Sequence, residues 1–516
     1  MQNELQLTEY MQKISNVSYN DGQKNFYYGQ SANLICIFAQ SVLYFNTIKA
    51  TGEFTKDGEN GMKKRLSFSE TMAVGSMLFG LFFGAGNLIF PALMGQKAGA
   101  NVWPAIVGFL ITGVGIPLLG VASMGMSRSD GLMQMSSRVG RKYGMFFTCA
   151  LYLTIGPFFA IPRCASTSFS VGIQPMLHNP EDGTWLIWIF SLLFFGAVLW
   201  FSLKPGKILT WVGKILTPLF LASIALLIVR ALISPIDSIS NVAPQPEYAT
   251  GTIGAFFKGF IEGYGTMDAL ASLAFGIVVI TTIRGLGVTE PTAIAGNTLR
   301  SGIFGCLIMA LIYMMLAIIG AQSHGQYPVS VDGGAALNLI ATHYFKGAGG
   351  IVLAVIATLA CLKTAVGLVT SCGEMFSQIF PKGPVYRVWA ITFCVVSFLI
   401  STMGLSAITA WSLPVLMFLY PLAITLILLA LFGRLFHHNR VIYISVTACT
   451  LVTALFDLVQ SLPYGLPKKP VLCNIVEIGK LLPFSELGLS WVCPAAVGLV
   501  IGVVLHLVCK KKPEAA

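Results

Sequence analysis

Long apolar stretches alternate with short polar segments along most of the chain. A helix needs about 20 mainly apolar residues to cross the hydrocarbon core of a bilayer, and stretches of that length recur here. Together with the turn residues between them they predict twelve helices. The expected ranges are 69–92, 103–126, 143–173, 184–203, 207–234, 252–283, 294–320, 347–380, 387–403, 406–433, 441–462 and 489–509. We therefore expect an all-α polytopic membrane protein.

The first apolar stretch contains residues that do not suit a continuous helix. Within LFGLFFGAGNLIFP at 78–91, Gly80, Gly84 and Gly86 each lower helix stability by about 1 kcal/mol relative to Ala. Asn87 favours hydrogen bonds to its own backbone, and the proline at the end of the stretch lacks an amide donor. Opened backbone at membrane depth persists only where a polar group completes it. This stretch is therefore expected to be a broken helix at the binding site of a carrier.

A second stretch of the same kind lies about five helices downstream. EGYGTMDALASLAFG at 262–276 places two glycines and a carboxylate inside a spanning helix. Broken helices at positions 1 and 6 indicate an inverted repeat of five plus five helices. We expect one transporter domain, 62–512, with repeats at about 69–234 and 252–433 and extra helices at 441–509.

Composition supports a membrane protein, since 55% of the 516 residues are hydrophobic, 10% are charged and the mean hydropathy is +0.77. A soluble globular protein of this length carries more charge. Lys and Arg number eighteen in the loops on the side of Met62 and seven on the opposite side. This asymmetry predicts that both termini are cytoplasmic, in the inner (plasma) membrane. It also explains the net charge of +11 better than nucleic-acid binding does.

The segment 1–61 does not follow this pattern. It carries four Lys and six acidic residues, so its net charge is −2, and its apolar run 34–45 is too short to span a bilayer. Met62-Lys-Lys-Arg leads directly into the first spanning helix. We expect the working protein to start at Met62, with 1–61 a disordered extension or a mis-assigned start.

The first break offers two kinds of polar group. Amides of Ala85, Gly86 and Asn87 lie at the start of a half-helix, where they can receive a carboxylate. Carbonyls near Gly80 and Phe83, at the end of the preceding half-helix, can coordinate a small cation. The alternative is that the glycines only allow close helix packing, which is common in membrane bundles.

The second break contains Asp268 in a position where a charge is costly, by about 2.5 to 3.5 kcal/mol on insertion scales. Its carboxylate can face a substrate amine, neutralise a cation, or hold the broken helix by accepting backbone amides. A structural role is at least as compatible with the sequence as direct ligation.

The helix expected at 347–380 carries hydroxyl groups and a lysine. Thr370 and Ser371 can supply oxygens to a hard cation, and Lys363 lies seven residues before Thr370 on nearly the same face. A buried ammonium can take the place of an ion or pair with an acid. The alternative for the hydroxyls is a bond to the carbonyl one turn back. Arg163, also inside a spanning stretch, has no role that the sequence settles.

Four segments in order resemble the branched-chain amino acid:cation symporter family, the carriers of leucine, isoleucine and valine. They are LFFGAGNLIFP at 81–91, LYLTIGPFFAIPR at 151–163, EGYGTMDALASLAFG at 262–276 and TAVGLVTSCGEMF at 364–376. The resemblance implies a LeuT-type fold with its five-plus-five repeat and a midplane site. It also implies coupling to Na+, or to H+ in some members, and no cofactor.

The resemblance further implies roles for particular residues. A G-x-G-N pattern that holds the substrate carboxylate falls on Gly84, Ala85, Gly86 and Asn87. The substrate amine is expected at the opened helix 6, and the cation between helix 1 and helix 8. The expected substrate residues on helix 6 are Gly263, Gly265, Thr266 and Asp268. The expected Na+ residues are Gly80, Phe83, Thr370 and Ser371, with Lys363 as a possible ion substitute.

These observations predict a secondary symporter that imports leucine, isoleucine and valine. Another small apolar amino acid as cargo is the alternative that keeps the fold. A membrane-embedded enzyme is disfavoured, because neither HExxH nor GxSxG occurs in the sequence. The sequence leaves open the coupling ion, its stoichiometry, the oligomeric state and the preference among the three amino acids.

Overall fold

The computed structural model describes residues 65–127, 131–177, 182–463, 465–468 and 470–510. The segment 1–61, for which we expected an extension, lies outside the described residues. All described helices except the end of α11 belong to one compact unit, Gly61–Ile228 with Pro235–Ala516. The account below concerns this unit.

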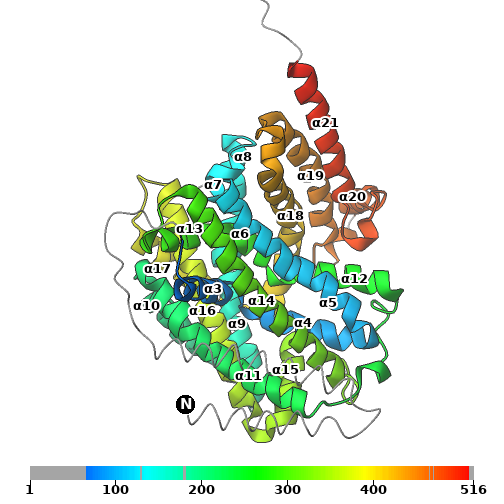
Figure 1. The fold of residues 1–516 in the computed structure, drawn as a ribbon. Helices are drawn as coiled ribbons and strands as arrows, with labels where there is room; N and C mark the ends of the chain where they lie inside the picture. Colours follow the sequence, from blue (N-terminus) through cyan, green and yellow to red (C-terminus); the bar gives the residue numbers. More distant parts are fainter. Residues whose placement is uncertain (1–64, 128–130, 178–181, 464, 469, 511–516) are drawn as a thin grey trace, which may run out of the picture. The chain divides into compact units, whose positions relative to one another are not determined.

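Helices make up all the regular structure of the described residues (Figure 1). The helices before the second break are α3 (Phe68–Phe82), α4 (Ala85–Ala98), α5 (Val102–Leu110), α6 (Ile116–Met126), α7 (Leu132–Ser136), α8 (Arg141–Leu153), α9 (Ala160–Ser168), α10 (Asp182–Ser202), α11 (Thr217–Ile233) and α12 (Gly251–Glu262). Those after it are α13 (Asp268–Gly285), α14 (Pro291–Ser323), α15 (Gly333–Phe345), α16 (Gly349–Ile379), α17 (Tyr386–Ser401), α18 (Leu405–Phe432), α19 (Arg440–Gln460), α20 (Pro470–Lys480) and α21 (Val492–Lys510).

Both predicted breaks are present. Helix α3 ends at Phe82, Phe83 and Gly84 leave helical geometry, and α4 begins at Ala85. Helix α12 passes into a short 3-10 turn, and Met267 takes a left-handed conformation with φ of 66° before α13 begins. The glycines of both stretches, with Asn87 and the following proline in the first and Asp268 in the second, thus predicted where the helices open.

The helix predicted at 143–173 is wrong as one continuous element. A π-helical turn, Thr154–Phe158, follows α8, and Gly156 has φ of −89° and ψ of −125°, outside the helical region. Phe159 is also irregular, and α9 starts only at Ala160. The cause is local, because Pro157 contributes no amide and displaces the backbone of the preceding turn.

The broken helices lie beside intact ones. Helix α14 packs against both α3 and α4, α16 packs against α3 and α9, and α12 packs against α5 (Figure 1). Farther along the chain α18, α19 and α21 form a neighbouring group in the same unit. The uninterrupted helices α14 and α16 thus lie directly against the broken helix formed by α3 and α4.

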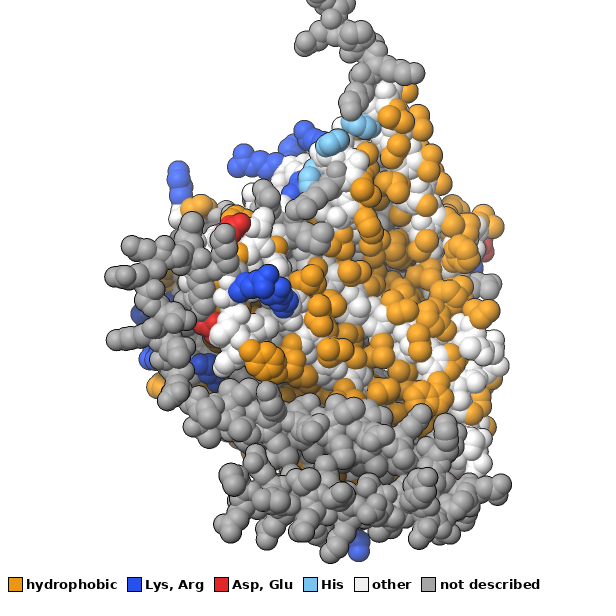
Figure 2. All heavy atoms as spheres, viewed as in Figure 1, with side chains coloured by type: hydrophobic (Ala, Val, Ile, Leu, Met, Phe, Trp, Pro, Cys, Tyr) orange, Lys and Arg blue, Asp and Glu red, His pale blue; other side chains and the backbone are white. Residues whose placement is uncertain are grey.

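Surface composition agrees with a bilayer environment. Within the described residues nine helical segments are long and apolar enough to span a membrane, and three more apolar helices are shorter. Large apolar side chains face outward, such as Leu193 at 69% and Trp200 at 73% exposure, and Figure 2 shows many apolar side chains on one face. The expected count of twelve and the inverted repeat remain predictions. Helices α7, α15 and α20 lie in segments where none was expected.

Candidate functional site

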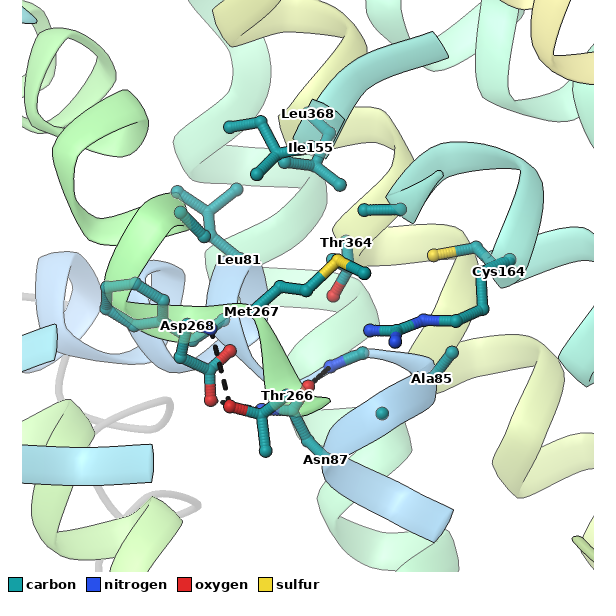
Figure 3. Close-up of a pocket in the computed structure, with 16 residues that line it drawn as sticks. Leu81, Ala85, Asn87, Ile155, Cys164, Thr266, Met267, Asp268, Thr364 and Leu368 are labelled. Atoms are coloured by element: carbon teal, nitrogen blue, oxygen red, sulfur yellow. Dashed lines mark hydrogen bonds between the residues drawn. The ribbon is translucent and has the colours of Figure 1, made fainter. Parts of the chain in front are cut away.

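A small cavity lies where the breaks meet (Figure 3). Its wall combines residues of α3, α4, the turn before α9, α9, the second break, α13 and α16. It offers about 20 Å³ to the centre of a water molecule, which is room for a water and little more. A molecule the size of leucine enters only if the wall moves apart.

The first break presents amides of a helix start to this cavity. The amide of Gly84 donates to Asn87 Oδ1 over 2.9 Å, so the helix start is closed locally on one side. Ala85 and Gly86, the first two residues of α4, have amides that an α-helix leaves without internal acceptors. Both residues line the cavity, at the positive end of the helix dipole. This arrangement suits a carboxylate.

Glycine at position 86 allows the two breaks to approach closely. A Cβ atom added there would lie 2.8 Å from Arg163 Nη2 and 3.1 Å from the Gly265 carbonyl oxygen. At Gly84 an added Cβ would lie 2.9 Å from the Thr364 side chain. Each of these separations is too short for an unstrained contact. The glycines that open the first break are therefore also required for its close packing against the neighbouring segments.

Asp268 connects three helices. Its Oδ2 atom accepts hydrogen bonds from Asn87 Nδ2 over 2.5 Å and from the Tyr313 hydroxyl over 2.8 Å, and Asn87 Nδ2 also contacts that hydroxyl. The carboxylate is 1% exposed and also belongs to the cavity wall. These contacts support a structural role for Asp268 in joining the helices. The carboxylate still lines the cavity, where a substrate could contact it.

The second break is stabilised by hydrogen bonds between the Thr266 hydroxyl and nearby backbone groups. Thr266 Oγ1 donates to the Gly263 carbonyl over 2.9 Å and accepts from the Asp268 amide over 3.3 Å. Of the four residues expected here, Thr266 and Asp268 line the cavity, whereas Gly263 and Gly265 do not. A left-handed non-glycine residue such as Met267 costs about 1 to 3 kcal/mol, and its side chain lines the cavity.

The carbonyls expected to hold a cation contact a lysine. Lys363, fully buried on α16, donates from Nζ to the Gly80 carbonyl over 3.1 Å and to the Phe83 carbonyl. The ammonium also lies 4.5 Å from the ring centre of Phe220. Thr364 Oγ1 donates to the same Gly80 carbonyl over 3.2 Å. One end of the first break is thus completed by a positive side chain.

The hydroxyls of Thr370 and Ser371 lie elsewhere. Thr370 is six residues beyond Thr364, which is about 9 Å along a helix. Ser371 donates to the Ala274 carbonyl of α13 over 2.7 Å. The structure therefore brings Lys363 and Thr364 to the helix 1 carbonyls and does not bring the predicted hydroxyl pair there. The sequence signal that could have identified Thr364 was its position directly after Lys363.

In the described ranges, no group of three or more His, Cys, Asp or Glu residues lies close enough together to hold a metal ion.

Comparison with known proteins connects this geometry to a family. The family model described as "Branched-chain amino acid transport protein" matches residues 67–509. A branched-chain amino acid permease BrnQ of Lactobacillus delbrueckii subsp. lactis is 48% identical over 451 residues, covering 87% of this chain and all of the relative. The permease BraB of Bacillus subtilis is 40% identical, covering 86% and 97%.

Solved structures share the fold at low identity. A Na+-coupled sialic acid symporter matches with a TM-score of 0.56 and 14% identity, over 93% of this chain and 97% of that one. Mhp1, a nucleobase-cation-symport-1 family transporter, matches with 0.53 and 16%, over 88% and 97%. These likenesses confirm the transporter fold class and carry nothing about cargo.

Proposed function

This chain belongs to the family of branched-chain amino acid transport proteins, and we propose that it imports leucine, isoleucine and valine in symport with Na+ or H+. The observation that carries the proposal is the meeting of two opened helices at one buried cavity with amides on one side and a carboxylate on the other. Transport is the activity of the family; the three cargoes, the ion and the mechanism are our proposal.

The polar ends of a zwitterion match the two breaks. We assign its carboxylate to the amides of Ala85 and Gly86, and its ammonium to Asp268 and the opened backbone before it. The branched side chain would lie toward Leu81, Ile155 and Leu368, which form apolar wall in Figure 3. Discrimination among the three substrates is expected to be weak, because one methylene is worth about 1 to 3 kcal/mol in an apolar pocket.

Lys363 bears on the choice of ion. Its ammonium already contacts the two carbonyls that a Na+ ion would need at the first break. A Na+ ion at the same carbonyls would have to displace this charge, which Coulomb repulsion opposes. The contacts therefore favour H+ carried by the Lys363 amine over Na+ at this position, and Na+ elsewhere in the site remains the alternative.

The small size of the cavity supports a proposal of alternating access. Substrate loading needs a wider site than the one enclosed here, so we propose that the breaks open toward one membrane face at a time. The five-plus-five repeat and two cytoplasmic termini in the cell membrane belong to the same proposal.

Uptake of radiolabelled leucine into proteoliposomes tests the function. We expect accumulation when an inward H+ or Na+ gradient is imposed, and competition by unlabelled isoleucine and valine. Stronger competition by alanine or methionine than by the branched set would favour the alternative cargo. Absence of stimulation by either gradient would contradict the symport proposal.

A further inference from the structure

Arg163 is a buried charge that the assignments above leave unused. It lies in the first turn of α9, directly after the interruption at Gly156–Phe159, and it is 3% exposed. The interrupted helix presents it to the cavity, whose wall it helps to form. A buried ionic side chain in a membrane helix is costly, so its retention here calls for a partner.

The guanidinium lies between the two breaks. Nη1 donates to the Gly265 carbonyl oxygen over 2.9 Å, which places it against the second break. Nη2 lies 2.8 Å from the point that a Cβ on Gly86 would occupy, so it is next to the first turn of α4. Its carbon Cζ is 5.8 Å from the ring centre of Phe90.

Arg163 forms no direct ion pair with an acid of the described residues, although Asp268 lines the same cavity and attracts its charge. No carboxylate oxygen of a described residue lies within 4.0 Å of it, and its Nε atom has no hydrogen-bond partner. The Oδ2 atom of Asp268 is engaged by Asn87 and Tyr313 instead. A buried guanidinium without a directly hydrogen-bonded anion is unfavourable, and a carboxylate bound against it would supply that contact.

The amides at the start of α4 add to the positive potential that Arg163 produces in the cavity. The amides at this helix start, which have no acceptor within their own helix, and the guanidinium beside them make one electropositive face of the cavity. The fork of an arginine matches the two oxygens of a carboxylate.

We propose that Arg163 binds the carboxylate of the transported amino acid, together with the amides of Ala85 and Gly86. This assignment rests on the proposed function, since it names a specificity residue for the same site. It makes recognition depend on a negatively charged group in the cargo. Analogues that keep the branched chain and amine but lack the carboxylate should therefore gain nothing from Arg163.

A purely structural role is the competing explanation. The bond from Nη1 to the Gly265 carbonyl joins α9 to the second break. If that were its whole function, removing the guanidinium would lower the affinity of the cavity for every ligand by a similar factor. The two roles therefore differ in how the effect depends on the ligand.

The test compares leucine with leucinol in the purified full-length protein, by equilibrium binding of radiolabelled leucine and its displacement by each compound. A hydrogen bond to a charged group typically contributes 1.5–3 kcal/mol, so Arg163→Gln should weaken leucine binding by roughly 10- to 100-fold. Leucinol binding should change by less than about threefold. Arg163→Lys keeps the positive charge but loses the planar guanidinium, so its leucine affinity should lie between those of the wild type and Arg163→Gln.

Thr167→Val is the matched control, because Thr167 lies on α9 outside the cavity wall and its buried hydroxyl has no hydrogen-bond partner among the described residues. It should leave the ratio of leucinol to leucine affinity unchanged. If Arg163→Gln lowers the affinities for leucine and leucinol by the same factor, so that their ratio is unchanged, the assignment is overturned. If that variant does not fold, the same ratio measured in Arg163→Lys decides. Failure of wild-type protein to bind any branched-chain amino acid would instead defeat the proposed function itself.

Discussion

Asn87 donates a 2.5 Å hydrogen bond to Asp268, joining the helix that begins after the first break to the helix that begins after the second. Tyr313 of the intact helix α14 donates to the same carboxylate oxygen over 2.8 Å. Asn87 also accepts from the Gly84 amide. One uncharged side chain thus closes one helix start and connects it to the other, so the shape of the cavity depends on it.

Replacing Asn87 by Asp should abolish leucine uptake. The change removes the donor to Asp268 and places a second carboxylate in hydrogen-bond range, where like charges oppose each other. We expect at least a tenfold loss of uptake and a lower midpoint of thermal unfolding. Asn101→Asp is the control, because Asn101 donates only to the Tyr248 carbonyl away from the cavity. Near-normal uptake by Asn87→Asp would show that this bond does not shape the site.

Gly86→Ala should impair uptake although the change adds one methyl group. The new Cβ would lie 2.8 Å from Arg163 Nη2 and 3.1 Å from the Gly265 carbonyl. Gly196→Ala on α10 is the matched control, since an added Cβ there meets nothing within 4 Å. Initial uptake rates of both variants, normalised to protein in the membrane, should fall several-fold for Gly86→Ala alone. Equal rates would contradict the close approach of the two breaks.

Lys363→Met should separate binding from coupling. The substitution keeps an unbranched apolar chain but removes the amine that contacts the Gly80 and Phe83 carbonyls. We expect loss of accumulation driven by a proton gradient, while exchange of internal for external leucine persists. Lys97→Met is the control, because Lys97 forms an ion pair with Glu247 over 3.1 Å and is partly exposed. Proton-driven accumulation by Lys363→Met at the wild-type level would exclude Lys363 as the proton carrier.

Two sets of hydroxyls give different expectations for the ion site. Thr364→Val removes a donor to the Gly80 carbonyl, whereas the double change of Thr370 and Ser371 to Ala leaves that carbonyl untouched. We expect only Thr364→Val to shift the ion concentration that gives half-maximal uptake, by about threefold or more, since one hydrogen bond contributes about 1 kcal/mol. A shift in the double variant alone would place the ion at Thr370 and Ser371, as the sequence suggested.

The sequence predicted the two main breaks because their cause is local. Clustered glycines weaken a helix wherever it is placed, so residues 80–91, which also contain Asn and Pro, and residues 262–268 carried their own signal. The interruption at Gly156–Phe159 also contains a Gly-Pro pair, yet the apolar stretch around it is continuous. Such a pair is compatible with a kinked helix, and only packing shows that α9 begins anew.

The contacts between distant segments were beyond sequence reasoning. Periodicity places Lys363 and Thr370 on one face of α16, but it does not say which of them is level with Gly80. That register depends on how α16 packs against α3. The same limit applies to Tyr313, which reaches Asp268 from α14, and to Arg163, which lines the cavity from α9, because the sequence does not show which distant residues they meet.

The central claim is best tested by leucine uptake into proteoliposomes with the H+ and Na+ gradients varied independently. We predict accumulation above the equilibrium level when at least one inward gradient is imposed, with the H+ gradient effective in the absence of Na+, and return to equilibrium when both are collapsed. Leucine that reaches the same equilibrium level under every gradient would contradict symport, and no leucine entry at all would contradict the assignment of cargo.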